Sequence, residues 1–218
     1  MARNKHPEKT IEQILEVSTK LFIKQGYEKT TIQDIIIELQ MSKGAIYHHF
    51  KSKEEILYAV INKRSVYAKG MLIELINTTT GKNMRDKISN IMMATILDKK
   101  NHEIDSILVS QIYHPEFVLA GMHSAVFDDA PMIAKLFEEG VIDGSITTHS
   151  PAICAEMFIF LINIWINPIL FSRDLQQTKE RLLFMQKTMK DLGADIVTDE
   201  LIEQIVVGYT NMNSFESQ

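Results

Sequence analysis

Apolar residues recur along this chain mostly at spacings of three and four, which is the pattern of helices that bury one face. The chain has 218 residues with only 9 Gly and 5 Pro, so the connections between helices are expected to be short. A break is expected at Asp128–Pro131. The pattern predicts an all-α fold with helices near 7–25, 31–39, 43–50, 53–77, 83–99, 102–113, 116–127, 131–143, 151–171, 175–192 and 199–212.

Capping signals place the ends of the first helices. Thr30 with Gln33 fits a capping box, and Ser42 is suited to cap the short helix that follows. Ser52 with Glu55 fits a second capping box, at the start of the long predicted helix. These signals predict two short helices on either side of a tight turn, followed by a long one.

The segment around that turn points to DNA. The helix after Ser42 presents Lys43, Tyr47 and His48 over about two turns, and it is too short to build much core of its own. A helix of this length and composition can lie in the major groove of a duplex. We therefore expect a DNA-binding helix-turn-helix near the start of the chain.

The charge distribution agrees with this placement. Residues 1–64 carry 11 Lys and Arg against 8 Asp and Glu, which is +3, while residues 65–218 carry 12 against 20, which is −8, giving the net −5 of the whole chain. A mildly basic head on an acidic body fits DNA contact at one end. The predicted organisation is a DNA-binding domain over 1–52, a connecting helix over 53–77 and a larger helical domain over 78–218.

Other classes of protein find little support. A single cysteine, Cys154, excludes an internal disulfide and fits a cytoplasmic protein, and no apolar run follows the N-terminus as in a secretory signal. No nucleophile elbow, phosphate-binding glycine loop or HExxH motif is present. The histidines of the body lack the spacing of a zinc site. We expect no enzyme activity, no cofactor and no metal.

The most apolar stretch is 151–171. A membrane span needs about 20 apolar residues, but Glu156, Asn163, Asn167 and Pro168 interrupt this one. A helix that packs on its own domain and on a twofold-related copy is also apolar nearly all round. We expect a homodimer interface here and no membrane contact.

The first 60 or so residues resemble the N-terminal domain of the tetracycline-repressor (TetR) family. The resemblance rests on the ordered set Leu21-Phe22, Gly26-Tyr27, Thr30-Thr31, Ile35, Ser42-Lys43-Gly44, Ile46-Tyr47, His49-Phe50 and Ser52-Lys53-Glu54. Two positions depart from the family pattern, since Ile36 stands where Ala is usual and Gln40 where Gly is usual. The resemblance implies a three-helix DNA-binding domain followed by a ligand-binding and dimerisation domain, with Tyr47 and Lys53 contacting DNA.

The predicted DNA contacts combine phosphate donors with a close-approach surface. Hydroxyl and ammonium groups, and the free N–H groups at a helix start, donate to phosphate oxygens, while Gly44 and Ala45 let the helix approach base edges. Packing of the three-helix head is the alternative role for Tyr47 and His49. The predicted set is Thr30, Thr31, Ser42, Lys43, Gly44, Ala45, Tyr47, His48, His49 and Lys53.

The body is rich in methionine, with 10 of the 12 Met residues from Met71 onward. Flexible Met side chains suit pockets for varied apolar ligands, although ordinary core is the commoner role. The predicted wall residues are Met92, Met93, Met122, Phe158 and Trp165. The expected effector is hydrophobic or amphipathic, and the acidic body favours a neutral or cationic one.

Together with the resemblance, these features predict a DNA-binding transcriptional regulator that a small lipophilic ligand releases from a palindromic double-stranded operator. The resemblance implies repression, the commoner behaviour in that family, and leaves activation open. The alternatives are a helical adaptor that binds another protein through its C-terminal domain, and a helical enzyme with an unrecognised site.

Overall fold

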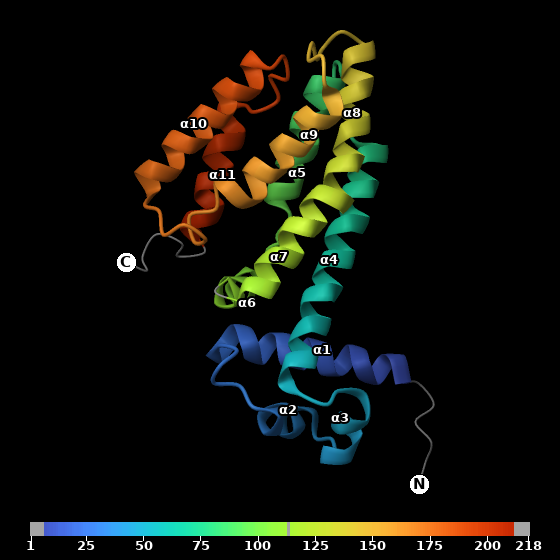
Figure 1. Cartoon of the computed structure of the whole chain (residues 1–218). Coiled ribbons are helices and arrows are strands. Elements are labelled where there is room, and N and C mark those ends of the chain that lie inside the picture. Colours follow the sequence, from blue (N-terminus) through green and yellow to red (C-terminus); the bar gives the residue numbers. More distant parts are fainter. Residues whose placement is uncertain (1–6, 113, 212–218) are drawn as a thin grey trace. The chain divides into compact units, whose positions relative to one another are not determined.

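The structure, a computed structural model, describes residues 7–112 and 114–211, and every regular element within these ranges is helical. The predicted all-α class is confirmed. In chain order the elements are α1 (Pro7–Gln25), α2 (Ile32–Leu39), α3 (Lys43–His49), α4 (Lys53–Thr78), α5 (Met84–Leu97), α6 (Asp105–Gln111), α7 (Pro115–Ser124), the π-helical turn η1 (Ala125–Asp129), α8 (Ala130–Ile142), α9 (Pro151–Phe160), the π-helical turn η2 (Leu161–Trp165), α10 (Leu175–Asp191) and α11 (Asp199–Asn211) (Figure 1).

The chain divides into two compact units. The first ends at Ala68 and also takes in His102–Ser110, while the second comprises Lys69–Asn101 and the chain from Gln111 onward. Residues 102–110 lie within the range 78–218 expected for the second domain, yet they pack with the first unit.

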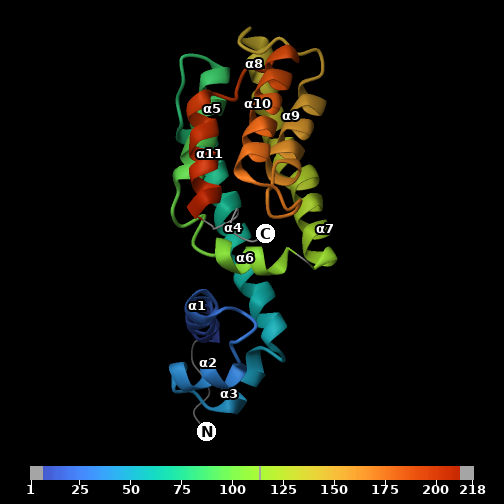
Figure 2. The same ribbon diagram turned by 90° about the vertical axis from the view of Figure 1, so that its left-hand side faces the viewer.

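The first unit is a helical head with its own apolar core. In this unit α1 packs on α2, and α2 on α3 (Figure 2). Ile14 of α1, Ile35 of α2 and Ile46 of α3 are fully buried, and Ile104 and Ile107 join the same core from the distant segment. One apolar side of each short helix is therefore covered, which leaves its other side to carry function.

The second unit is built around α8, α9 and α5. Helix α8 packs along α9 and against α5, while α11 lies against α5 and α10 (Figure 1). Its fully buried side chains include Phe137 of α8 and Phe158 of α9. Within the described residues, none of the helices has the length and apolar character to cross a membrane.

The break predicted at Asp128–Pro131 was wrong. The chain passes from α7 through η1 into α8 without leaving a helical path. The N–H of Ala130 donates to the carbonyl of Ala125, five residues back, instead of the usual four. This π-helical register accommodates one extra residue just before the proline, so the helix continues where a stop was expected.

Two other predicted helices are shorter than expected. The 151–171 helix ends with η2, because Asn167 turns the chain by accepting bonds from the N–H groups of Ile169 and Leu170 at 3.0 and 3.2 Å. The 102–113 helix begins only at Asp105, whose carboxylate lies 2.7 Å from the His102 ring and stabilises the preceding turn.

Candidate DNA-binding surface

The second helix of the head begins at a capping box, one residue later than predicted. Thr31, not Thr30, is the N-cap of α2, and its hydroxyl accepts from the Asp34 N–H at 3.1 Å. The Asp34 carboxylate in turn accepts from the Thr31 N–H at 2.8 Å. This backbone bond, followed by the bond from the Thr31 hydroxyl, lowers the pKa of Asp34. The exposed Thr31 is thereby fixed at the amino end of α2.

The turn after α2 keeps a left-handed conformation without glycine. Gln40 has φ 53° and ψ 33°, and its N–H donates to the carbonyls of Ile36 and Ile37. The N–H of Met41 also donates to the carbonyl of Ile36 at 3.2 Å, as in a Schellman cap. Replacement of the usual glycine by Gln40 therefore preserves this turn, although a side chain in that region costs about 1 kcal/mol or more.

Helix α3 is held by one buried anchor and one cap. Ile46 is fully buried, while the Ser42 hydroxyl accepts from the Ala45 N–H at 3.2 Å. A hydroxyl that accepts in this way keeps its own hydrogen to donate elsewhere. Capping is therefore compatible with a phosphate contact from Ser42.

Most of the predicted contact residues meet on the outer side of α3. Ser42, Lys43, Gly44 and His48 are exposed, and Ala45, Tyr47 and His49 are half-buried. The Lys43 ammonium lies 5.6 Å from the centroid of the Tyr47 ring, and the rings of His48 and His49 are 5.0 Å apart. This side of α3 presents a cation, an aromatic hydroxyl and imidazoles around a position that has no side chain.

Thr30 does not belong to this surface. Its side chain is 1% exposed, and its hydroxyl donates to the Gly26 carbonyl at 2.8 Å. The prediction of a DNA contact from the Thr30 side chain was wrong, because this side chain closes the α1–α2 loop from inside.

Lys53, at the start of α4, is tied to that same loop. Its ammonium donates to the carbonyl of Tyr27 at 2.8 Å and of Glu28 at 3.4 Å, and it lies 4.1 Å from the centroid of the Tyr27 ring. Burial and the nearby Glu54 carboxylate raise the pKa of Tyr27 to about 12. An ammonium has three donors, so one donor remains for a phosphate.

Lys51 is a candidate contact that the sequence did not single out. It is exposed just after α3, and its ammonium donates to the Tyr47 carbonyl at 2.9 Å. Half of the predicted Ser52–Glu55 capping box is present, because the Ser52 hydroxyl accepts from the Glu55 N–H at 3.2 Å. The Glu55 carboxylate, however, accepts from the N–H of Lys51 at 2.6 Å instead of the N–H of Ser52. The only signal in the sequence was the pair of lysines on either side of Ser52.

The predicted effector residues do not line the pocket that the second unit contains. Phe158 is fully buried in the core of the second unit, while Met92, Met93 and Trp165 pack against that core and Met122 is half-buried. A pocket of about 610 Å³ is present in this unit, but none of the five residues lines it.

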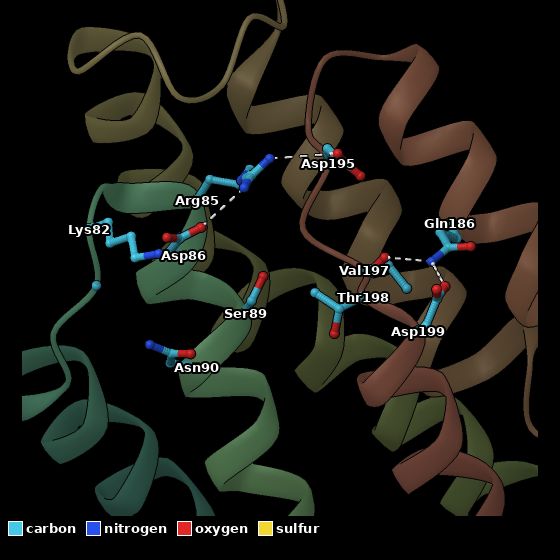
Figure 3. Close-up of a pocket in the computed structure, with 11 residues that line it drawn as sticks. Lys82, Arg85, Asp86, Ser89, Asn90, Gln186, Asp195, Val197, Thr198 and Asp199 are labelled. Atoms are coloured by element: carbon cyan, nitrogen blue, oxygen red, sulfur yellow. Dashed lines mark hydrogen bonds and ion pairs between the residues drawn. The ribbon is translucent and has the colours of Figure 1, made fainter.

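That pocket lies between the start of α5 and the α10–α11 connection, and its lining is mainly polar. Figure 3 shows Lys82, Arg85 and Asp86 on one side and Thr198 and Asp199 on the other. An ion pair between the Arg85 guanidinium and the Asp195 carboxylate, 3.6 Å apart, links the two sides of the pocket. The Met-lined apolar pocket predicted from the sequence is not the cavity found here.

Comparison with known proteins gives a clear match for the head. Residues 14–60 match the family described as bacterial regulatory proteins, tetR family. The uncharacterized HTH-type transcriptional regulator YerO of Bacillus subtilis is 33% identical over 92 residues, covering 42% of this chain and 32% of YerO. The HTH-type transcriptional regulator QacR of Staphylococcus aureus is 43% identical over 51 residues, covering 23% of this chain and 27% of QacR.

A longer match extends beyond the head. The HTH-type transcriptional repressor KstR2 of Mycolicibacterium smegmatis is 24% identical over 140 residues, covering 62% of this chain and 66% of KstR2. The chain thus spans about a third of YerO and just under two thirds of KstR2.

Two solved structures resemble the whole chain. A TetR/AcrR-family regulator from Thermobifida fusca matches with a TM-score of 0.59 and 22% identity, covering 93% of this chain and 99% of that one. A transcriptional regulator from Cytophaga hutchinsonii matches with a TM-score of 0.62 and 16% identity, covering 94% and 95%. At identities this low, the likeness shows the fold alone.

Proposed function

We propose that this chain, a member of the TetR family of bacterial regulatory proteins through its N-terminal domain, is a ligand-responsive transcriptional repressor. It acts in the cytoplasm. It binds a palindromic operator as a homodimer. A small hydrophobic or amphipathic effector binds the second unit and favours a conformation in which the two recognition helices no longer fit half-sites about 34–36 Å apart.

The observation that carries this proposal is the outer side of α3. Its cap and its buried anchor fix the helix, while Lys43, Gly44 and Tyr47 are left for contact with a groove. Ser42, Thr31 and Lys53 supply donors around it that suit phosphate oxygens. Repression is proposed over activation because KstR2, which matches over 140 residues, is named a repressor.

The proposal is tested at Tyr47 and Lys53. We expect Tyr47→Ala and Lys53→Ala each to weaken operator binding by about tenfold or more, since each removes a polar contact worth about 1.4 kcal/mol. Lys53→Ala should also reduce the slope of log K against log salt by about one unit. Fluorescence anisotropy with a labelled palindromic duplex at several salt concentrations measures both.

Matched controls separate contact from folding. Tyr58→Ala removes an exposed tyrosine from α4, and Lys63→Ala removes an exposed α4 lysine that pairs with Glu12 at 3.7 Å. Both controls should keep operator affinity. Lys53→Ala also loses its bonds to the α1–α2 loop, so thermal melting is recorded alongside. Unchanged affinity in Tyr47→Ala and Lys53→Ala together would remove this surface from the DNA interface.

Assembly is tested on α9. Ile153 is 71% exposed at the third position of the helix, where a glutamate suits the helix dipole. We expect Ile153→Glu to convert a dimer at micromolar concentration into a folded monomer in sedimentation experiments. Ile142→Glu, on α8 outside residues 151–171 and 85% exposed, should leave the dimer intact. A dimer unaffected by Ile153→Glu would place the interface elsewhere.

A helical adaptor protein is the rival function. An adaptor is expected not to bind a palindromic duplex, so no salt-dependent affinity for the duplex would be measured. Salt-dependent binding in the wild-type chain therefore separates the two functions before any variant is made.

A further inference from the structure

Two arginines and three aromatic rings meet where η2 gives way to α10. Arg173 lies with its guanidinium carbon 4.4 Å from the centroid of Phe171 and 5.8 Å from that of Trp165. Arg181 lies 5.9 Å from the same Trp165 ring, whose centroid is 6.1 Å from that of Phe184. We call these five residues the aromatic–arginine cluster.

Neither guanidinium has an ion-pair partner in the part of the chain that the structure describes. Arg173 donates to the backbone carbonyl of Trp165, and Arg181 to that of Gln177 at 2.8 Å. The two nearest acids in sequence are engaged elsewhere. Asp174 caps α10 by accepting from the Gln177 N–H at 2.7 Å, and Glu180 accepts from the Gln176 side chain at 3.0 Å.

Both arginines are half-buried beside the same Trp165 ring. Burial, and then the charge of Arg181, lower the pKa of Arg173. The Nε atom of Arg181 is buried without a hydrogen-bond acceptor. Partly desolvated like charges without a counterion are unfavourable. A bound anion would offset both the desolvation and the repulsion between the two arginines.

Apolar surface lies beside these charges. Phe171 is 48% exposed and Phe184 is 63% exposed. Leu183, at the preceding position of α10, is 54% exposed. Phe171 is the last residue of the stretch 151–171 that is proposed as the homodimer interface. A ligand that placed a carboxylate on the arginines would find apolar surface for the rest of its body on α10, beside that stretch.

We infer that the aromatic–arginine cluster binds an amphipathic anion, with its carboxylate on Arg173 and Arg181 and its acyl or aryl body against Phe171 and Phe184. Guanidinium groups accept carboxylates in a bidentate geometry and stack on aromatic rings at the same time. This reverses the preference for neutral or cationic ligands drawn from the −8 charge of residues 65–218. The reversal has a physical reason, because salt screens a distant field over about 8 Å while the arginines act in direct contact.

The test uses dodecanoate, below its micellar concentration, with the full chain in the absence of DNA. Trp165 is the only tryptophan, so its fluorescence reports on the cluster. We expect saturable binding of dodecanoate, with dodecanol and dodecyltrimethylammonium bound at least about tenfold more weakly. Arg181→Gln should lower dodecanoate affinity about tenfold. Arg181 is chosen because Arg173 also closes the end of η2.

Lys179→Gln is the matched control, since it removes one positive charge from an exposed position of the same helix. It should bind dodecanoate like the wild type. Equal affinity for dodecanol and dodecanoate would overturn the inference, as would an equal loss in Lys179→Gln. A weakened dimer in Arg181→Gln with unchanged dodecanoate affinity would also overturn it, and would assign the cluster to a subunit contact.

An effector role for this anion rests on the proposed function. Dodecanoate is then expected to lower operator affinity in the wild type and to do so less in Arg181→Gln. Intact dodecanoate binding with an unchanged operator complex would overturn the effector role. A chain that bound dodecanoate but never bound a palindromic duplex would instead contradict the proposed function.

Discussion

Gly44→Glu is expected to abolish operator binding while leaving the fold intact. Gly44 is exposed at the second position of α3, and a Cβ added there meets no atom within 4 Å. A glutamate in the first turn of a helix favours the helix dipole, so α3 should not lose stability. The same carboxylate would face the phosphates and bases of a duplex. We expect a loss of at least about 100-fold, or about 2.7 kcal/mol.

Two controls make this result specific. Gly208→Glu adds the same side chain in α11, where a Cβ also meets no atom within 4 Å, and it should keep operator affinity. Gly44→Lys adds similar length with the opposite charge and should retain non-specific, salt-sensitive binding. Anisotropy with labelled duplex and thermal melting by circular dichroism are the measurements. Full affinity in Gly44→Glu would exclude α3 from the interface.

Phe158→Ala is expected to lower the free energy of unfolding by about 3–5 kcal/mol. Phe158 is fully buried in the apolar core of the second unit, so its removal leaves a cavity that the surrounding helices fill only in part. The sequence placed Phe158 on a ligand pocket wall, and a wall residue would cost less to remove. Chemical denaturation followed by circular dichroism measures the difference.

Phe127→Ala is the matched control, because Phe127 is 65% exposed in η1 and makes a single ring contact with His123 at 4.3 Å. Its loss should change stability by no more than about 0.5 kcal/mol. If Phe158→Ala lowered the free energy of unfolding by less than about 1 kcal/mol, Phe158 would border a cavity, as predicted from the sequence, and would not be a core residue.

The positions of the helices could be predicted from the sequence, because a helix that buries one face has apolar residues at regular spacings of three and four. The end of a helix is harder to place, as Thr30 and Thr31 show. Each threonine has a residue three positions on that suits a capping box, Gln33 or Asp34, so the pattern supports both. Only the tertiary burial of Thr30 decides between them. The π-helical turn before Pro131 is likewise a matter of register that residue types do not specify.

The candidate site was predictable to the extent that its chemistry lies in consecutive residues. The exposed side of α3 follows from its short length and its polar residues. The hydrogen bond from the Lys53 ammonium to the Tyr27 carbonyl was not predictable, because it joins a side chain to a backbone group 26 positions away. The effector site stays a prediction for another reason. Met and aromatic residues at helical spacing look the same whether they fill a core or line a cavity, and Phe158 fills the core.

The contacts that hold Lys53 in the free protein also affect the entropy of DNA binding. A lysine that first meets a phosphate from a mobile state loses up to about 2 kcal/mol of rotamer freedom. The Lys53 side chain is already ordered by two loop carbonyls and the Tyr27 ring. Its phosphate contact would therefore carry little of that penalty, whereas an exposed residue such as Lys43 would carry most of it. Of two lysines with equal charge, the tethered one is expected to contribute more to affinity at the same salt concentration.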